Sequence, residues 1–391
     1  MPFENAKQYN DPVGGTPSSA GVQHRTDYYH KKALVEAVKE EYFGQLASSK
    51  NMPKHMGKTM KLYHYLPLLD DRNINDQGID ASGAVITDGN LYGSSKDVGT
   101  ITSKIPLLSE TGGRVNRVGF KRIPIEGSIE KMGFFDEYTQ DSLDFDTDSE
   151  LRMHVNREMV VGADQLTEAV LQSDILNSAG TVKYAGAASM NSEVGPDDLV
   201  TYDDLIKLGI DLDNNRTPKQ SKVITGTRII DTKVVSGGRP MYVPSELIPT
   251  LMAMKDYHGE KAFVEVKHYA SSGQTLRGEV GSIAGFRIIT PLEMQRYEGE
   301  GAVGDNTSYE TNGNVDVFPM LVVGDESFAT IGFQTDGKTV KFKIIHKPPG
   351  EERADRHDPY GETGFMAIKW FYGFLPLRPE RIARFMTAGK A

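Results

Sequence analysis

The chain has 391 residues, a formal net charge of −10 and no cysteine. Without thiols, disulfides, thiolate metal sites and a cysteine nucleophile are excluded, and the acidic balance argues against a protein that grips nucleic acid mainly through its phosphates. Hydrophobic residues make up 38% of the chain, which is enough to fill a core and excludes wholesale disorder. No apolar run reaches the length of about 18 residues that a membrane span needs, and the first residues lack a signal-peptide pattern, which favours synthesis in the cytoplasm.

The chain opens with two contrasting segments. Residues 1–24 are polar and rich in Gly, Pro, Ser and Asn, which is typical of an extended arm. Residues 25–69 follow the arm, and their pattern predicts a helix over 26–47 and a short strand at 61–69. The apolar face of that helix repeats every four residues and comprises Leu34, Val38, Tyr42 and Leu46.

Residues 70–127 form an unusual excursion, long, rich in Gly, Asn, Asp and Ser, and short of large apolar clusters. Its strand-like pieces alternate apolar and polar residues, and Gly112 and Gly113 suit a hairpin turn between two of them. Because an isolated two-stranded hairpin is marginal in water, we expect the excursion to project and to lie on a neighbouring subunit. The basic residues expected to make these intersubunit contacts are Lys96, Lys104, Arg114, Arg117, Lys121 and Arg122.

Residues 128–198 are predicted to be built around one long helix at 147–178. Thr147 and Glu150 have the spacing of a capping box, and Gly180 offers a stop in the left-handed conformation. At about 1.5 Å per residue the helix is a rod of roughly 45 Å. Its acidic approach suits the positive end of the helix dipole.

The predicted long helix carries one apolar stripe with steps of three to four residues. A glycine in mid-helix costs about 1 kcal/mol relative to alanine, so we expect a neighbour to pack closely at Gly162. The residues expected to form the packing face are Leu151, Val155, Met159, Gly162, Leu166 and Val170.

Residues 199–330 alternate helical and strand-like patterns, which predicts an α/β domain. Thr201 and Asp204 open a helix at 205–214, and a second helix is expected at 245–255. Strands are expected at 223–226, 239–243, 262–269 and 285–289. Residues 331–391 return to a strand-like pattern and end in a basic cluster of Arg378, Arg381, Arg384 and Lys390. We interpret this cluster as a solvated end or a contact with an acidic neighbouring subunit, and contact with packaged nucleic acid is a less favoured alternative.

Motifs that carry chemistry are incomplete. The run PKHMGKT at 53–59 ends like a phosphate-binding loop but lacks the first glycine, and residues 71–82 mimic a calcium loop with Asp76 where glycine is needed. The nine histidines never reach metal-ligand spacing. We therefore predict no catalytic residue, no cofactor and no metal, and a turn between strands for Gly278, Gly281 and Gly285.

The order of arm, helix, β excursion, long helix, α/β part and returning strands resembles the major capsid proteins of tailed bacteriophages. Three segments are closer still to capsid proteins of Enquatrovirus-like podophages and related prophages: HYLPLLDDRNINDQGIDASG at 64–83, LRGEVGSIAGFRIITPLEM at 276–294, and HDPYGETGFMAIKWFYGFLPLRPERIAR at 357–384. The resemblance implies the α+β HK97-like fold. That fold has an N-terminal arm, an extended β-hairpin loop, a long spine helix, a peripheral domain and an α/β axial domain.

The resemblance also implies a function. It predicts a non-enzymatic homo-oligomer whose hexamers and pentamers form an icosahedral head around double-stranded DNA, bound without sequence specificity. The expected partners are a separate scaffold protein, a portal and decoration proteins, and the expected location is the virion after assembly in the host cytoplasm. Two alternatives stay open: an encapsulin-type compartment, which shares the fold, and a soluble α+β enzyme or binding protein.

Overall fold

The computed structural model describes residues 42–53, 55, 57–65, 122–145, 151–224, 232–268, 275–335, 338–339, 342–350 and 358–391. The predicted arm and nearly all of the predicted excursion lie outside these residues. The chain divides into two compact units, which are described separately. The first unit includes Asp136–Met159 and His346–Met366, and the second includes Lys39–Phe135, Val160–Ile345 and Ala367–Ala391.

One seven-stranded mixed sheet forms the centre of the α/β part, within the second unit. Every residue of its middle strands β13, β7 and β10 is buried, and β13 is a continuous apolar run, VFPMLVV. The strands in spatial order are β4 (Thr181–Tyr184), β18 (Ile382–Ala388), β13 (Val317–Val323), β7 (Arg239–Tyr242), β10 (Phe286–Ile289), β9 (Glu279–Ile283) and β8 (Val264–Glu265).

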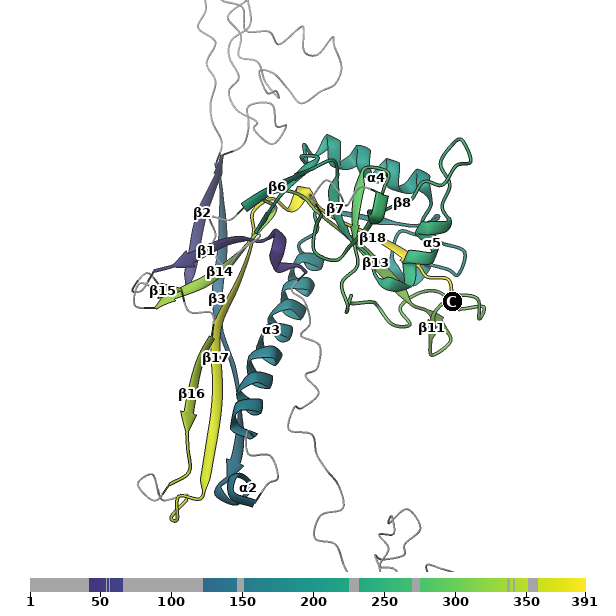
Figure 1. Cartoon of the computed structure of the whole chain (residues 1–391). Helices are drawn as coiled ribbons and strands as arrows, with labels where there is room; N and C mark the ends of the chain where they lie inside the picture. Colours follow the sequence, from purple (N-terminus) through teal and green to yellow (C-terminus); the bar gives the residue numbers. More distant parts are fainter. Residues whose placement is uncertain are drawn as a thin grey trace, which may run out of the picture. The chain divides into compact units, whose positions relative to one another are not determined.

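Helices α4 (Tyr202–Asn214) and α5 (Ile248–Ala253) pack on this sheet (Figure 1). The predicted capping box is confirmed: the Asp204 amide donates to Thr201 Oγ1 at 3.3 Å, and the Thr201 amide donates to Asp204 Oδ2 at 3.1 Å. The apolar face of α4 is fully covered by the shared core. Its buried leucines are Leu205, Leu208 and Leu212.

Two local predictions in this part need correction. The helix expected at 245–255 is split into η4 (Ser245–Leu247) and α5, with a proline in the first turn of α5. The strand expected at 262–269 is only β8, because η5 (Val266–His268) follows at once. The predicted turn is confirmed where β9 meets β10, since Ala284 and Gly285 have positive φ angles of 50° and 82°. It is wrong at Gly281, which lies within β9 and pairs with Ile288 of β10.

The C-terminal segment is a central strand, so the prediction of a solvated basic end is wrong. β18 pairs antiparallel with β13 and parallel with β4. Arg384 is half-buried and donates to the Leu176 carbonyl at 3.4 Å, while Arg381 donates to the Asp325 carbonyl at 2.9 Å, and burial lowers the pKa of Arg381. Arg384 is half-buried although it is charged, because the other residues of β18 are buried.

A second sheet is built on long strands in the order β1 (Ser48–Met52), β14 (Phe328–Thr335), β17 (Thr363–Pro376), β3 (Arg122–Thr139) and β2 (Thr59–Tyr65). β15 (Lys338–Thr339) pairs with β14, and β16 (Phe342–Lys347) pairs with β17. The 18-residue strand β3 was not predicted. Its residues were divided between the excursion and the acidic approach to the long helix.

The remaining described elements are short. Two hairpins are formed by β5 (Gln220–Ile224) with β6 (Thr232–Ser236), and by β11 (Glu310–Thr311) with β12 (Asn314–Val315). One further α-helix is α2 (Gln140–Phe145), and the single-turn 3₁₀ helices are η2 (Gly44–Leu46), η3 (Asn191–Glu193) and η8 (Pro379–Arg381).

The long helix is α3, Leu151–Asn177 (Figure 1). Its predicted packing face holds at Met159, which is buried, whereas Val155 and Val170 are half-buried and the side chain of Leu151 is not described. The prediction is wrong at Leu166, which is 45% exposed. The buried residues of α3 are spaced four residues apart. The predicted face contains a step of three residues, from Met159 to Gly162, and Leu166, which follows that step, therefore lies off the buried face. Further buried apolar residues of α3 are Ala163, Leu171, Ile175 and Leu176.

Two glycines of this region differ from expectation. Of the described atoms, only Phe134 Cζ, at 3.7 Å, lies within 4 Å of a Cβ placed on Gly162, so no close neighbour occupies this site. Gly180 does not adopt the predicted left-handed conformation. Its amide donates to the Pro379 carbonyl at 3.0 Å, and an added Cβ would lie 2.6 Å from that oxygen. The predicted capping box at 147–150 lies outside the described residues.

The two glycines give a matched pair of variants. Gly162→Ala is expected to raise the free energy of unfolding by about 0.5–1 kcal/mol, because alanine favours the helix and has room. Gly180→Ala is expected to lower it by about 1–3 kcal/mol through the backbone clash. Thermal unfolding followed by the fluorescence of Trp370, the sole tryptophan, measures both. A destabilised Gly162→Ala would show that another part of the chain packs on this turn.

A second prediction concerns pH. The buried Arg239 side chain forms an ion pair with Asp213 and donates to the Thr217 carbonyl at 2.6 Å, which ties the end of α4 to β7. The hydrogen bond from Arg239 lowers the pKa of Asp213. A lowered folded pKa means that the ion pair stabilises the fold above the unfolded pKa of about 3.9, and that this stabilisation is lost as the pH falls through the folded value.

Asp213→Asn is therefore expected to be less stable at pH 7 by about 1 kcal/mol, a figure kept low because Asp213 is partly exposed. The difference from the wild type should shrink as the pH approaches 3. Urea unfolding across the pH range measures this. Asp211→Asn, which removes an exposed ion pair with Lys183 on the same helix, is the control and should change little. A difference in the free energy of unfolding between the wild type and Asp213→Asn that stays constant with pH would contradict the assignment of the lowered pKa to this ion pair.

Candidate functional site

Residues 42–47 attach the N-terminal segment to the body, and we call them the anchor. The amides of Phe43 and Gly44 donate to the two carboxylate oxygens of Glu168 on α3, at 3.0 and 3.1 Å. A carboxylate at this point satisfies amides that the first turn of η2 leaves without partners. The predicted helix over 26–47 is therefore wrong for the anchor, where η2 leads directly into β1.

Three further contacts hold the anchor. The Tyr242 hydroxyl, fully buried on β7, donates to the Tyr42 carbonyl at 2.7 Å, and burial raises the pKa of Tyr242 well above its usual value. The ring of Tyr242 lies 4.4 Å from that of Phe43. The Gln45 side chain donates to the Arg277 carbonyl at 3.3 Å and accepts from the Arg277 amide at 3.2 Å. The anchor thus joins α3, β7 and the turn before β9.

No local pattern indicates the anchor, because its partners are 124 to 232 residues away along the chain. One partial signal exists at Gly278. A Cβ there would lie 2.3 Å from the ring of Tyr42, and the residue has a positive φ angle of 73°. Glycine is therefore needed both for the turn and for the approach of the ring.

The predicted excursion is bounded by two paired strands, β2 and β3. β2 and β3 pair antiparallel from Thr59 and Ser128 up to Tyr65 and Arg122, the last described residues on each side. The Arg122 guanidinium lies 4.5 Å from the ring centre of Tyr63, a cation–π contact within the chain. The other residues predicted for intersubunit contact lie outside the described part: Lys96, Lys104, Arg114, Arg117 and Lys121.

Within the second unit, α3 is fastened to β3 and β17 (Figure 1). The Tyr372 hydroxyl donates to Asp174 at 2.6 Å, and burial together with this bond raises the pKa of Tyr372. The rings of Phe134 and Phe342 meet Trp370 edge-on, with centroids 5.9 and 5.7 Å apart. These contacts hold one face of the strands against the helix.

The same strands leave large apolar side chains in solvent. Phe135 on β3 is 63% exposed, and Phe371 on β17 is also exposed. In the first unit, taken by itself, Phe145 and Tyr360 are each at least 80% exposed. Several large exposed apolar residues on a protein with a filled core indicate a surface that another subunit covers.

The first unit is also acidic and locally ordered by its own contacts. The Tyr138 hydroxyl is hydrogen-bonded to Nε2 of His346, and the two rings stack. The Gln140 amide donates to the Glu362 carbonyl at 2.8 Å. Its described acidic residues near α2 are Asp136, Glu137, Asp141 and Asp144.

Neither a metal centre nor a membrane span is found in the described part. No three His, Asp or Glu side chains there converge as metal ligands. None of the described helices combines the length and the apolar character needed to cross a bilayer.

Comparison with known proteins identifies the family, although no family profile matches the sequence. The major capsid protein of Pseudomonas phage KPP21 is 59% identical over 392 aligned residues, which cover 100% of this chain and 98% of that protein. The capsid of Ralstonia phage GP4 has a similar fold, with a TM-score of 0.57 and 12% identity over 95% of this chain and 97% of that one.

A second solved structure agrees. The capsid of cyanophage P-SCSP1u aligns with a TM-score of 0.52 and 15% identity, over 93% of each chain. At such identities the two solved structures support the fold alone, whereas the family assignment rests on the relative from phage KPP21. The narrower resemblance to Enquatrovirus-like phages stays a prediction. The chain belongs to the phage major capsid proteins, the structural subunits of a multi-subunit virion shell, and has their HK97-like α+β fold.

Proposed function

We propose that this chain forms the hexamers and pentamers of an icosahedral head that encloses double-stranded DNA. It assembles in the host cytoplasm with a separate scaffold protein, a portal and decoration proteins. The full-length relative, named a major capsid protein, supports a viral shell over an encapsulin-type compartment or an enzyme. The proposed role of the subunit is structural, and it binds the surfaces of neighbouring subunits.

The closed ladder between β2 and β3 is the observation that carries this proposal. Tyr65 pairs with Arg122 across the ladder, so the 56 residues at 66–121 begin and end at one place. The described body has a core without them. A segment of this length that the body does not need for its core is available to bury area on neighbours, and obligate interfaces bury above about 2,000 Å².

Charge supports a contact between the excursion and the acidic end of β3 on a neighbouring subunit. The excursion carries Lys96, Lys104 and Arg117 among its basic residues. The acidic side chains around α2 lie beside exposed aromatic residues. Opposite charges around an apolar centre favour a fixed register between subunits.

The acidic balance also fits a container for DNA. Strong phosphate binding by many lysines and arginines would hold the DNA against the wall. The net charge is −10, and the C-terminal arginines Arg381 and Arg384 donate to backbone carbonyls of the subunit itself. We expect contacts with DNA to be few and independent of sequence.

Deletion of residues 89–113 tests the proposal. The variant is expected to fold, with the wild-type fluorescence of Trp370, and to form no closed particles by negative-stain electron microscopy when expressed with the scaffold protein. A variant in which the same residues are replaced by a Gly/Ser chain of equal length is the matched control for length and is also expected to fail. Intact particles from either variant would overturn the role of the excursion.

A further inference from the structure

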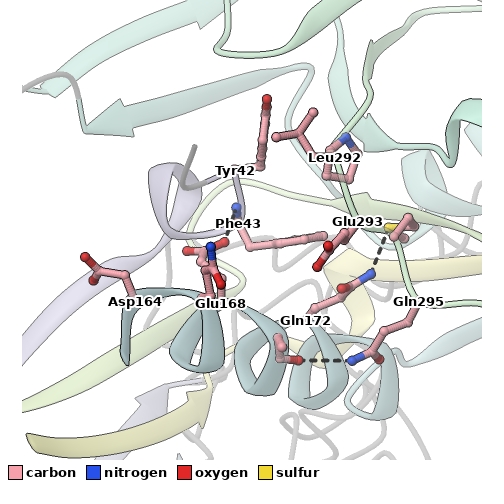
Figure 2. A pocket seen from close by; sticks show the side chains of 12 residues that line it. Tyr42, Phe43, Asp164, Glu168, Gln172, Leu292, Glu293 and Gln295 are labelled. Atoms are coloured by element: carbon pink, nitrogen blue, oxygen red, sulfur yellow. Dashed lines mark hydrogen bonds between the residues drawn. The ribbon is translucent and has the colours of Figure 1, made fainter. Parts of the chain in front are cut away.

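A small cleft lies beside the anchor, within the second unit (Figure 2). Its volume is about 180 Å³. One wall is the face of α3 that carries Asp164, Glu168 and Gln172, and the other wall is the segment 291–295 after β10. Phe43 of the anchor completes the lining.

The lining combines apolar surface with negative charge. Phe43 and Pro291 are apolar, and Leu292 is 64% exposed although it is large and apolar. Carboxylates come from Asp164, Glu168 and Glu293, and the described lining residues include no lysine or arginine. The volume lies below the roughly 300–1,000 Å³ of small-molecule sites. The cleft therefore suits one or two side chains of a protein partner that combine apolar surface with positive charge.

Hydrogen bonds between the two walls hold the cleft open. The Gln172 side-chain amide, in a residue that is 2% exposed, donates to the Met294 sulfur at 3.0 Å. The Gln295 side chain donates to the Ala169 carbonyl at 3.1 Å. Both bonds join α3 to the segment 291–295, and Figure 2 shows them as dashed lines. A preformed site loses less conformational entropy when a partner binds.

The end of the β2–β3 ladder has the complementary character. Tyr63 and Tyr65 are 56% and 62% exposed, and the Arg122 guanidinium lies 4.5 Å from the ring centre of Tyr63. We call these three residues the ladder end. The stack of Arg122 on Tyr63 presents an aromatic ring and a cation together. Tyrosine and arginine are also enriched among the residues that supply most of the binding energy of protein interfaces.

The sequence around the ladder end adds no opposing charge. No aspartate or glutamate occurs at 61–69 or at 111–125. The nearest carboxylate on the ladder, Glu126, forms an ion pair with Lys61 at 2.6 Å. The ladder end therefore keeps its positive character where it meets a partner.

We propose that the cleft of one subunit binds the ladder end of a second copy. In this contact the Tyr63 ring covers Leu292 at the edge of the cleft. The Arg122 guanidinium faces Asp164 and Glu293. Because the ladder end is the base of the predicted excursion, the contact sets the direction in which the excursion crosses the neighbour.

The fold decides in favour of a second copy over the same chain. The cleft and the ladder end both belong to the second unit, and none of the described lining residues comes from β2 or β3. Pairing up to Tyr65 and Arg122 holds the ladder end in its own sheet. The contact therefore joins two different surfaces of two copies. Such a heterologous contact, repeated around an axis, closes a ring, and this consequence rests on the proposed hexamers and pentamers.

The absence of cysteine from the chain allows a direct test. One full-length chain carries Tyr65→Cys and another carries Leu292→Cys, and the two are mixed with the scaffold protein and oxidised. A mixed disulfide dimer is expected to form about ten-fold faster than in a control mixture, because docked cysteines have a high effective concentration. The control mixture pairs Tyr65→Cys with Ile210→Cys, an exposed position on α4.

A charge exchange tests the recognition itself. Arg122→Glu, added to the chain with Tyr65→Cys, is expected to slow the mixed cross-link about ten-fold, because like charges then meet in the cleft. Glu293→Arg in the other chain should restore most of the rate. Glu265→Arg, the same change on β8 outside the cleft, is the matched control and should restore none of it.

Three results would overturn the proposal: equal rates in the test and control mixtures, homodimers of one single-cysteine chain in place of mixed dimers, and a slowed cross-link that Glu293→Arg does not restore. Trp370 fluorescence confirms that each variant is folded, and Tyr63→Cys with Glu293→Cys is a second pair. Particles are scored separately by electron microscopy. Heads without the cross-link would contradict the contact alone, and the cross-link without DNA-filled heads would contradict the proposed function alone.

Discussion

The carboxylate of Glu168 is the point on which the arrangement of this subunit depends. It accepts the amides of Phe43 and Gly44, while Tyr242 and Gln45 complete the attachment from two other parts of the chain. These contacts fix Tyr42 beside α3, and β1, which follows the anchor, lies at the edge of the second sheet. A change at this contact would move both the N-terminal segment and the first strand.

The described residues separate into a part that stabilises the subunit and parts available to neighbours. The α/β sheet has buried residues along its central strands and is covered by α4 and α5. The second sheet contacts α3 through Tyr372 and Phe134 yet exposes Phe135 and Phe371. Buried apolar area in the first part supplies the folding free energy. Exposed apolar area in the second is a source of association free energy.

Local patterns predicted much of the fold. The helix start at Thr201 and the strands at 239–243 and 285–289 depend on neighbouring residues, and α4, β7 and β10 lie where the pattern places them. The predictions failed where partners are distant. β18 was interpreted as a basic end because its pairing with β13 cannot be read from its own sequence. β3 was not predicted as a strand because its partners, β17 and β2, are distant along the chain.

The candidate site was the least predictable part for the same reason. No residue of the anchor signals that Glu168 or Tyr242 will meet it, and the stripe on α3 was misplaced at Leu166 because two steps, of three and four residues, fit the apolar pattern. The excursion predicted at 70–127 stays a prediction, and its last residues belong to β3, which pairs with β2. The family resemblance could not supply the contacts that fix where segments leave the body.

Hydrogen–deuterium exchange on free subunits and assembled shells tests the central claim most directly. The account predicts that residues 66–121 exchange fast in the free subunit and gain strong protection on assembly, while β13 and β18 are equally protected in both states. Unchanged exchange of residues 66–121 on assembly would contradict the claim that this segment is buried between subunits.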